Sequence, residues 1–115
     1  MDECIFCKIV LGQLPAKFVY QDDDIIAIKD IHPKAPIHLL VMPRKHRESL
    51  KDIKREDQEV LGKLLLVVQK VAADAKIAED GYKVFINSGH DAGQIVFHLH
   101  LHVLGGWKKA PRWDV

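Results

Sequence analysis

Residues 98–104 read HLHLHVL, so three histidines alternate with apolar residues near the end of the chain. Side chains alternate between the two faces of a β-strand, and a strand over 95–104 therefore places all three imidazoles on one face. Every residue of its other face is apolar, so that face must lie against a hydrophobic core, which we expect beneath a helix. This face comprises Ile95, Phe97, Leu99, Leu101 and Val103.

The rest of the chain predicts four more strands and two helices. Two β-rich runs within 18–30 indicate a hairpin, and the apolar runs at 35–43 and 82–87 indicate two further strands. Between 55 and 77 apolar residues recur with helical spacing, and residues 3–13 indicate a short helical turn. These elements predict an α+β fold with a largely antiparallel five-stranded sheet, one long helix and a short N-terminal helix. The core-facing stripe of the long helix is widened by Leu61, Leu65 and Ala72.

The composition indicates one small globular domain. A chain of 115 residues is long enough for one hydrophobic core, so we expect a single domain over 1–115, with 103–115 forming the end of the last strand and a tail. Its 17 Lys and Arg nearly balance 16 Asp and Glu, which gives no long-range attraction to nucleic acid or to an anionic membrane. No stretch approaches the ~20 apolar residues of a membrane span, and the N-terminus lacks the leader of a secretory signal. We therefore expect a cytoplasmic protein without nucleic-acid or membrane partners.

Three histidines on one strand face admit three interpretations. The first is a solvated face, but three neighbouring imidazoles would repel one another if all were protonated. The second is a catalytic zinc ion held by His98, His100 and His102, because imidazole is a common zinc ligand. The third is a nucleophilic imidazole whose neighbours orient it or stabilise charge. The spacing alone leaves the two chemical interpretations open.

Cys4 and Cys7 form a C-x-x-C pair, which has the spacing of a structural zinc half-site. The sequence holds no second C-x-x-C, so the remaining ligands of such a site would have to be histidines. A Cys₂His₂ zinc site is formally neutral and could adjoin a reactive histidine without a large unbalanced charge. The pair could instead be two small buried residues or, with less support, a thioredoxin-type redox motif.

The segments KDIHPKAPIHLLVMPRKH and INSGHDAGQIVFHLHLHVLGG, together with HLHLHVL, resemble the histidine triad family and in particular its nucleotide-binding, HINT-like branch. The resemblance covers residues 3–106. It implies an α+β fold in which two protomers join their sheets across a homodimer. It also implies that the middle histidine attacks the α-phosphorus of a nucleoside phosphoramidate or a similar substrate.

The resemblance assigns a role to each histidine of the motif and to one histidine outside it. His100 would be the nucleophile and would form a covalent nucleotidyl-histidine that water hydrolyses. His102 would contact the phosphate or the leaving group, and His38 would orient the triad. A structural zinc ion, one per chain, would be held by Cys4, Cys7, His46 and His98.

The resemblance also implies a site for a purine nucleotide. Asn87 and the Gly93–Gln94 turn match the phosphate-binding stretch, where glycine lets backbone N–H groups approach phosphate oxygens. Asp30 matches the residue that accepts hydrogen bonds from the ribose hydroxyls. The apolar pocket around the base would comprise Phe6, Ile9, Leu14, Ile28 and Ile31.

The chain departs from the family pattern at Ile95, where many HINT-like members carry a serine thought to assist the leaving group. Isoleucine can neither donate nor accept a hydrogen bond, so the turnover rate and the leaving-group preference stay open. Trp107 and Trp113 in the tail indicate packing across a dimer or near the substrate.

The expected activity is that of a purine nucleoside phosphoramidase, which releases a nucleoside monophosphate from a 5′-phosphoramidate or an aminoacyl adenylate. A dinucleoside polyphosphate hydrolase is the nearest competing activity within the fold. Two further classes stay open: a zinc-dependent hydrolase with a catalytic metal among the three histidines, and a nucleotide-binding module with weak catalysis. The physiological substrate does not follow from the sequence.

Overall fold

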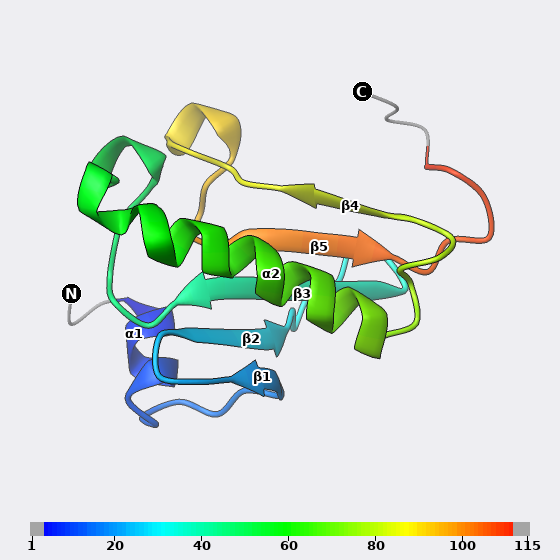
Figure 1. The fold of residues 1–115 in the computed structure, drawn as a ribbon, viewed down its shortest axis with the longest axis horizontal. Helices are drawn as coiled ribbons and strands as arrows, with labels where there is room; N and C mark the ends of the chain where they lie inside the picture. The colour runs from blue at the N-terminus through cyan, green and yellow to red at the C-terminus, as the bar shows by residue number, and fades with distance from the viewer. Residues whose placement is uncertain (1–3, 112–115) are drawn as a thin grey trace.

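A computed structural model describes residues 4–111 of the chain. Five strands form a single antiparallel sheet in the order β1-β2-β3-β5-β4 (Figure 1). The predicted α+β class, the five strands and both helices are confirmed. The elements are α1 (Ile5–Val10), β1 (Phe18–Gln21), β2 (Ile25–Lys29), β3 (Ile37–Pro43), α2 (Gln58–Asp74), β4 (Tyr82–Phe85) and β5 (Leu101–Gly105). Short 3₁₀ helices occur at Leu50–Asp52, Arg55–Asp57 and His90–Ala92.

The sheet carries a helix on each face, and the pleat of its strands divides the core in two. The long helix α2 lies across one face, and α1 lies on the other (Figure 1). In β2, Ile25 and Ala27 pack towards α2, whereas Ile26 and Ile28 pack towards α1. The same alternation in β3 places Leu39 and Val41 under α2 and leaves the intervening residues on the α1 face.

Helix α2 is shorter than the periodicity predicts. It begins at Gln58 rather than at Arg55, because the Asp57 carboxylate accepts the backbone N–H of Lys54 at 2.9 Å and the preceding turn is 3₁₀. It ends at Asp74, and Lys76 then adopts a positive φ of 62° before Ile77 returns to the core. Leu65 was expected to widen the core-facing stripe, but its side chain is 60% exposed.

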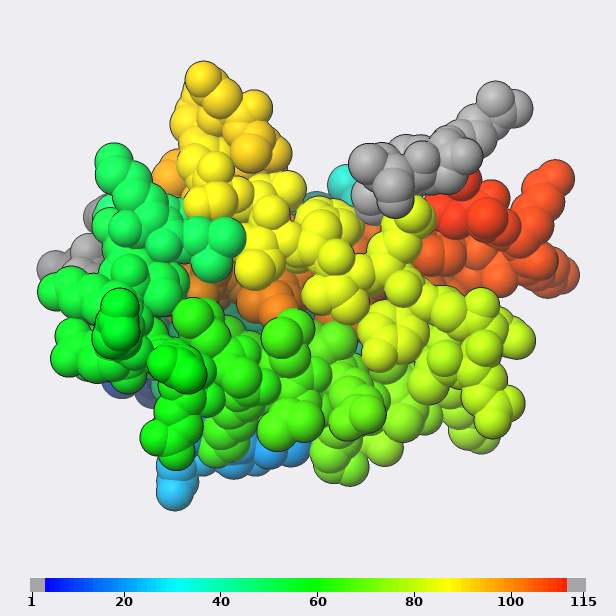
Figure 2. All heavy atoms as spheres, turned by 45° about the horizontal axis from the view of Figure 1, so that its top comes forward, coloured from blue at the N-terminus to red at the C-terminus, as the bar shows by residue number. Residues whose placement is uncertain are grey.

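The strand predicted over 95–104 is also shorter, since β5 begins only at Leu101. The segment before it leaves the sheet, and the backbone N–H of Leu99 donates to the carbonyl oxygen of Arg47 at 2.6 Å. Leu99, like the apolar face of β5, does lie in the core under α2, as predicted. Ile95 and Phe97 do not, because they precede the point where the chain joins the sheet and are 89% and 39% exposed. Residues near the 3₁₀ helix His90–Ala92 project beyond α2 as a knob (Figure 2).

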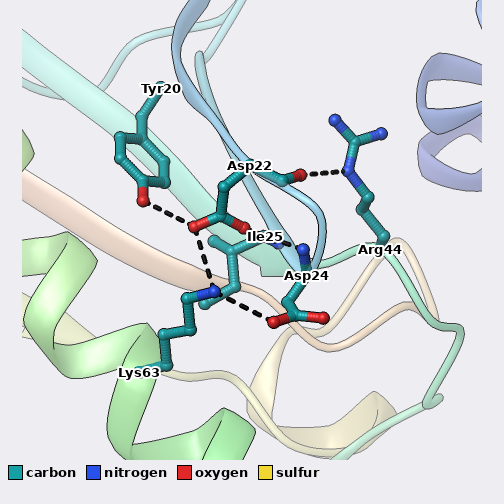
Figure 3. A network of polar contacts seen from close by, with 6 residues as sticks. All are labelled: Tyr20, Asp22, Asp24, Ile25, Arg44 and Lys63. Atoms are coloured by element: carbon teal, nitrogen blue, oxygen red, sulfur yellow. Dashed lines mark hydrogen bonds and ion pairs between the residues drawn. The ribbon is translucent and has the colours of Figure 1, made fainter.

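A polar network attaches α2 to the turn of the β1–β2 hairpin (Figure 3). Lys63 of α2 places its Nζ 3.2 Å from Asp22 and 2.9 Å from Asp24. The other Asp22 oxygen accepts the backbone N–H groups of Asp24 and Ile25, both at 2.8 Å, and so closes the turn. Burial alone would raise the pKa of Asp22, but the hydroxyl of Tyr20, these N–H groups and Lys63 together hold it well below its ordinary value.

Two features bear on partners. The edges of the sheet are β1 and β4, and neither has a second neighbour among the described residues. The predicted joining of two sheets in a homodimer therefore stays a prediction. Within residues 4–111, no helix combines the length and the hydrophobicity that crossing a membrane requires.

We predict that Lys63→Met destabilises the protein at neutral pH, because it removes the cation that both aspartates face. The pKa of Asp22 is depressed in the folded state, so the stability that it contributes is present above its ordinary pKa and disappears as the pH falls below it. The loss should be modest, since Lys63 is partly exposed and solvent screens the pair. Urea unfolding of both proteins should show a difference that holds from pH 7 down to the ordinary pKa of an aspartate and shrinks only in stronger acid, as Asp22 takes up a proton in the folded state. A constant difference would show that lost packing, and not charge, is responsible.

Candidate active site

The four predicted ligands of the structural zinc ion meet at His98, the first residue of the histidine segment (residues 98–104). Cys4 and Cys7 come from the beginning of α1, His46 follows β3, and His98 precedes β5. The Nδ1 atom of His98 lies 3.5 Å from each sulfur atom, and Nδ1 of His46 lies 3.2 Å from Cys7 Sγ. All four donor atoms lie within 4.8 Å of one another. The structure therefore brings together residues that are up to 94 positions apart in the sequence.

The protonation of this cluster suits a metal ion. Nε2 of the fully buried His98 donates to the carbonyl oxygen of Pro43 at 2.8 Å, so its Nδ1 keeps a lone pair and faces both thiols. Burial, followed by the neighbouring Cys4, raises the pKa of the Cys7 thiol to about 11 in the absence of a cation. A bound cation reverses this effect, because ligating thiols lose their protons. Two thiolates and two imidazoles are a donor set that zinc prefers.

His100 is buried and has one nitrogen committed to the backbone. Its Nδ1 donates to the carbonyl oxygen of His98 at 2.7 Å, so its Nε2 carries an unshared electron pair. Burial lowers the pKa of His100 and favours this neutral form, although the hydrogen bond to His98 acts in the opposite direction. The ring of Phe6 meets it edge-on, with centroids 5.0 Å apart. His100 is thus held as an oriented, neutral imidazole, which is the form a nucleophile needs.

His38 and His102 form a second fixed pair on the α1 face of the sheet. The backbone N–H of Lys34 donates to His38 Nδ1 at 3.0 Å, so the proton of neutral His38 must lie on Nε2. That Nε2 lies 2.9 Å from Nδ1 of His102 and 3.3 Å from the carboxylate of Asp30. His102 accepts at Nδ1 and therefore carries its own proton on Nε2. Burial, followed by the adjacent His100 and His38, lowers the pKa of His102 to about 4, so it is neutral at pH 7.

The same proton positions argue against a metal ion at Asp30, His38 and His102. The donor atoms of these residues also lie within 4.8 Å of one another. However, the Lys34 N–H requires the Nε2 of His38 to be protonated, and a protonated nitrogen cannot bind a metal. His100 joins no cluster of metal-binding groups among residues 4–111. A catalytic metal shared by His98, His100 and His102 therefore finds no support in this arrangement.

Phe85 is a site residue that the sequence did not single out. It lies opposite His102 in the pairing of β4 with β5, and its ring stacks on the imidazole with centroids 4.5 Å apart and planes 13° apart. The stack restricts the rotation of His102 from the side away from His38. Only the strand register reveals this contact, and residues 82–87 gave no indication of it beyond their strand pattern.

The predicted phosphate-binding turn is engaged within the protein. The N–H groups of Gly93 and Gln94 donate to the carbonyl oxygens of His90 and Gly89, at 3.0 and 3.1 Å. Gly93 has a φ of 94°, which requires glycine or strains any other residue. The side chain of Gln94 is 4% exposed, and its amide is used in internal hydrogen bonds. Binding of phosphate by these two N–H groups would need the loop to rearrange.

The other predicted substrate residues are divided between core and surface. Asp30 follows β2, and its second carboxylate oxygen accepts the backbone N–H of His32 at 2.8 Å. Asn87 is half-buried just after β4, and Trp107 is half-buried in the tail, whereas Trp113 lies outside the described residues. Of the predicted base pocket, Phe6, Ile9 and Ile28 lie in the core on the α1 face, and Leu14 and Ile31 are 39% and 83% exposed.

Comparison with known proteins identifies the family of this chain. The family model of the HIT domain matches residues 12–109. The chain belongs to the HIT (histidine triad) family. The α+β fold that the resemblance implied is thereby confirmed, whereas the joining of two sheets in a homodimer stays a prediction.

Three relatives show how closely this HIT protein resembles its family. A protein of Escherichia coli (strain K12) named purine nucleoside phosphoramidase is 40% identical over 110 residues, which cover 96% of this chain and 92% of that protein. A HIT family hydrolase from Clostridium thermocellum is 43% identical, with a TM-score of 0.94 over 99% of each chain. A Zn-bound histidine triad family protein from Mycobacterium smegmatis is 34% identical, with a TM-score of 0.79 over 93% of this chain and 77% of that chain.

We predict that Phe85→Leu releases the ring of His102, whereas Phe85→Tyr keeps it in place. Loss of the stacked pair should lower the free energy of unfolding by about 1 kcal/mol. In NMR spectra, the ring protons of His102 should lose the shift caused by the Phe85 ring current in the leucine variant and retain it in the tyrosine variant. Identical His102 resonances in all three proteins would show that the stack does not form in solution.

Proposed function

We propose that this HIT protein is a nucleotide-binding hydrolase. It would cleave purine nucleoside 5′-phosphoramidates, or aminoacyl adenylates, to the nucleoside monophosphate through a covalent nucleotidyl-His100 intermediate. The observation that carries the proposal is the placement of protons. His100 keeps a free electron pair on Nε2, and the neighbouring His102 keeps a proton on its Nε2. The name of the E. coli relative supports the phosphoramidate class of substrate.

In the first step, Nε2 of His100 forms a bond to the α-phosphorus as the bond from phosphorus to the leaving group breaks. The leaving atom is a nitrogen in a phosphoramidate, and the amine takes up a proton from water. In an aminoacyl adenylate it is an oxygen, and the amino acid leaves as a carboxylate that needs no proton. The hydrogen bond from Nδ1 to the His98 carbonyl holds the ring, so the attacking electron pair has a fixed direction. The Nε2–H of His102 is a hydrogen-bond donor for charge that develops on the phosphoryl oxygens or on the leaving group.

In the second step, water attacks the phosphorus, and the bond from phosphorus to His100 Nε2 breaks. The nucleoside monophosphate leaves, one proton of the water passes to solvent, and neutral His100 is restored. Both steps use one tautomer of His100, with its proton on Nδ1 throughout. The backbone carbonyl of His98 therefore serves the whole cycle.

The nucleotide would lie on the α1 face of the sheet. Phe6 contacts His100 directly, and we propose that it contacts the base together with Ile9, Leu14, Ile28 and Ile31. Asp30 would accept hydrogen bonds from the ribose hydroxyls, with Asn87 on the phosphate side. The backbone N–H groups of the Gly93–Gln94 turn would join Asn87 after a rearrangement of their loop. Asp30 also lies 3.3 Å from His38, so ribose binding and the orientation of His102 would involve the same carboxylate.

The metal cluster would hold one structural zinc ion per chain through Cys4, Cys7, His46 and His98. Bound there, zinc would supply structural cross-linking and would allow both thiols to ionise. His98 is itself a member of the cluster, and its carbonyl oxygen accepts from His100. Fixing the His98 side chain would therefore also fix the acceptor that orients the nucleophile.

The protein would act in the cytoplasm as a homodimer whose sheets join along β4. Exposed apolar side chains on β4 and on α2 favour this surface as the dimer contact, because contact with a partner would bury them. Val84 is 40% exposed, Leu65 60% and Leu66 65%. β4 also has an unpaired edge among the described residues. Isolated edges of this kind are seldom left uncovered in folded proteins.

A nucleotide-binding module with weak catalysis is the second candidate, and Ile95 is the observation that favours it. Its side chain is 89% exposed and offers no hydroxyl to a leaving group. Tight binding of AMP without turnover would establish this candidate. Restoration of turnover by Ile95→Ser would then identify the missing group.

For the metal, we predict close to one zinc ion per chain in protein purified without chelator. His46→Ala should greatly reduce that content, because it removes a ligand. His90→Ala is a matched control, since His90 is 91% exposed in the loop and outside the cluster, and it should retain the metal. Elemental analysis measures both variants, and a wild type with almost no zinc would refute the proposed site.

For the reaction, we predict that the wild type releases AMP from adenosine 5′-phosphoramidate and that His100→Ala loses at least about a thousandfold in kcat. Both proteins would first be treated with a mild chelator and shown by circular dichroism to stay folded. Turnover by the treated wild type would argue against a catalytic metal. A folded wild type that binds AMP and does not turn over would contradict the proposed function.

A further inference from the structure

The side-chain amide of Gln94 joins three separate segments of the chain. Its Nε2 donates to the carbonyl oxygen of Glu48 at 2.6 Å and to that of Val96 at 3.1 Å. Its Oε1 accepts the backbone N–H of Gly89 at 2.8 Å. Both protons of the amide and its oxygen are thus used inside the protein, and the side chain is 4% exposed.

The first of these segments is the loop from Gly89 to Gln94. The backbone N–H of Gln94 donates to the carbonyl oxygen of Gly89 at 3.1 Å, while the Gln94 side chain accepts from the N–H of Gly89. The loop is therefore closed twice by the same residue pair. This closed loop forms the knob that lies beside the 3₁₀ helices after β3 (Figures 1 and 2).

The second segment, residues 46–48, is itself held firmly. The guanidinium of Arg47 makes a paired contact with the buried carboxylate of Asp57 at the start of α2, at 2.7 and 3.1 Å. It also donates to the carbonyl oxygen of His46 at 3.1 Å. A bidentate pair of this kind fixes both direction and distance. The Glu48 carbonyl is consequently held in place, and the Gln94 amide attaches residues 94–100 to it.

The third segment is residues 94–100, which leave the sheet where a regular strand was expected. Two hydrogen bonds attach it to residues 46–48: Gln94 Nε2 to Glu48 at one end, and the Leu99 N–H to the carbonyl of Arg47 at 2.6 Å at the other. Leu99 lies between His98 and His100. The backbone at His98 and His100 is therefore positioned by hydrogen bonds to residues 46–48 and not by pairing with a neighbouring strand.

We propose that the side chain of Gln94 positions His98 and His100 and does not itself bind phosphate, so that any phosphate contact at this residue would be made by its backbone N–H. Its amide attaches residues 94–100 to residues 46–48 and to the loop at Gly89. It thereby determines the position of the His98 carbonyl, which accepts the hydrogen bond from His100 Nδ1. The consequence for catalysis rests on the proposed function, whereas the positioning itself does not.

The site requires an amide and not merely a side chain of that size. It offers two carbonyl acceptors and one N–H donor, which an amide satisfies together. Gln94→Met keeps the length but removes the hydrogen-bond partner of the Glu48 carbonyl and of the Gly89 N–H. Gln94→Glu keeps the acceptor for Gly89 but places a carboxylate against two carbonyl oxygens. Protonation of the introduced carboxylate restores one hydrogen-bond donor, so the activity of Gln94→Glu relative to the wild type should rise in acid.

The test compares both variants with Gln58→Met, a matched control at an exposed position on α2. In Gln94→Met, amide hydrogen exchange at Gly89 and Leu99 should accelerate about tenfold, corresponding to one lost hydrogen bond, while amides of β3 exchange as in the wild type. The control should match the wild type throughout. Unchanged exchange at Gly89 and Leu99 would overturn the proposal.

Turnover of adenosine 5′-phosphoramidate supplies the second measurement. Relative to the wild type, kcat of Gln94→Met should fall about tenfold at every pH, with the affinity for AMP preserved. The relative kcat of Gln94→Glu should rise as the pH falls from 8 to 6. Faster exchange with unchanged kcat would show that Gln94 is only structural and would also overturn the proposal. If the wild type itself does not turn over the substrate, the proposed function fails, and NMR then tests the positioning separately. Shifted resonances of the His100 ring in Gln94→Met would support the positioning role, and unchanged resonances would overturn it.

Discussion

The hydrogen bond from His98 Nε2 to the carbonyl oxygen of Pro43 is the contact on which the rest of the site depends. It directs the other nitrogen of His98 towards Cys4 and Cys7, and it fixes the residue whose own carbonyl accepts from His100. One buried imidazole thus lies between the cluster that could hold a metal ion and the histidine proposed as the nucleophile. If the His98 ring turned by 180° about its bond to Cβ, Cδ2 would replace Nδ1 opposite the two sulfur atoms, and the hydrogen bond to Pro43 would be lost.

The pleat of the sheet gives this arrangement its rigidity. Alternate residues of β3 and β5 pack against α2, and the residues between them, His38 and His102 included, face α1. His38 and His102 therefore lie on the face of the sheet opposite the core that packs under α2. A change in α2 packing would reach the site through strand positions and not through direct contact. Side chains on strands backed by a core are held more precisely than side chains on loops.

The sequence predicted those parts that follow from alternation and spacing. It placed Leu99, Leu101 and Val103 in the core and identified the Cys4–Cys7 pair as a half-site. It failed at Ile95 and Phe97, because the chain there bonds to Arg47 and Glu48, and such tertiary contacts leave no periodic signal. It also could not supply the histidine tautomers. These depend on backbone groups of Lys34, Pro43 and His98, which every residue possesses and no motif records.

The tautomers also bear on the missing serine at position 95. The chain of hydrogen bonds that gives His102 its Nε2 proton begins at the backbone of Lys34 and passes through His38, so it does not include residue 95. The exposed Ile95 therefore leaves that donor intact. Because burial lowers the pKa of His102 to about 4, its ring is neutral at pH 7. It carries a single ring N–H proton, which it can donate in a hydrogen bond. A hydroxyl absent at residue 95 would consequently affect only the leaving group, because the orientation of His100 and the donor at His102 do not depend on that residue.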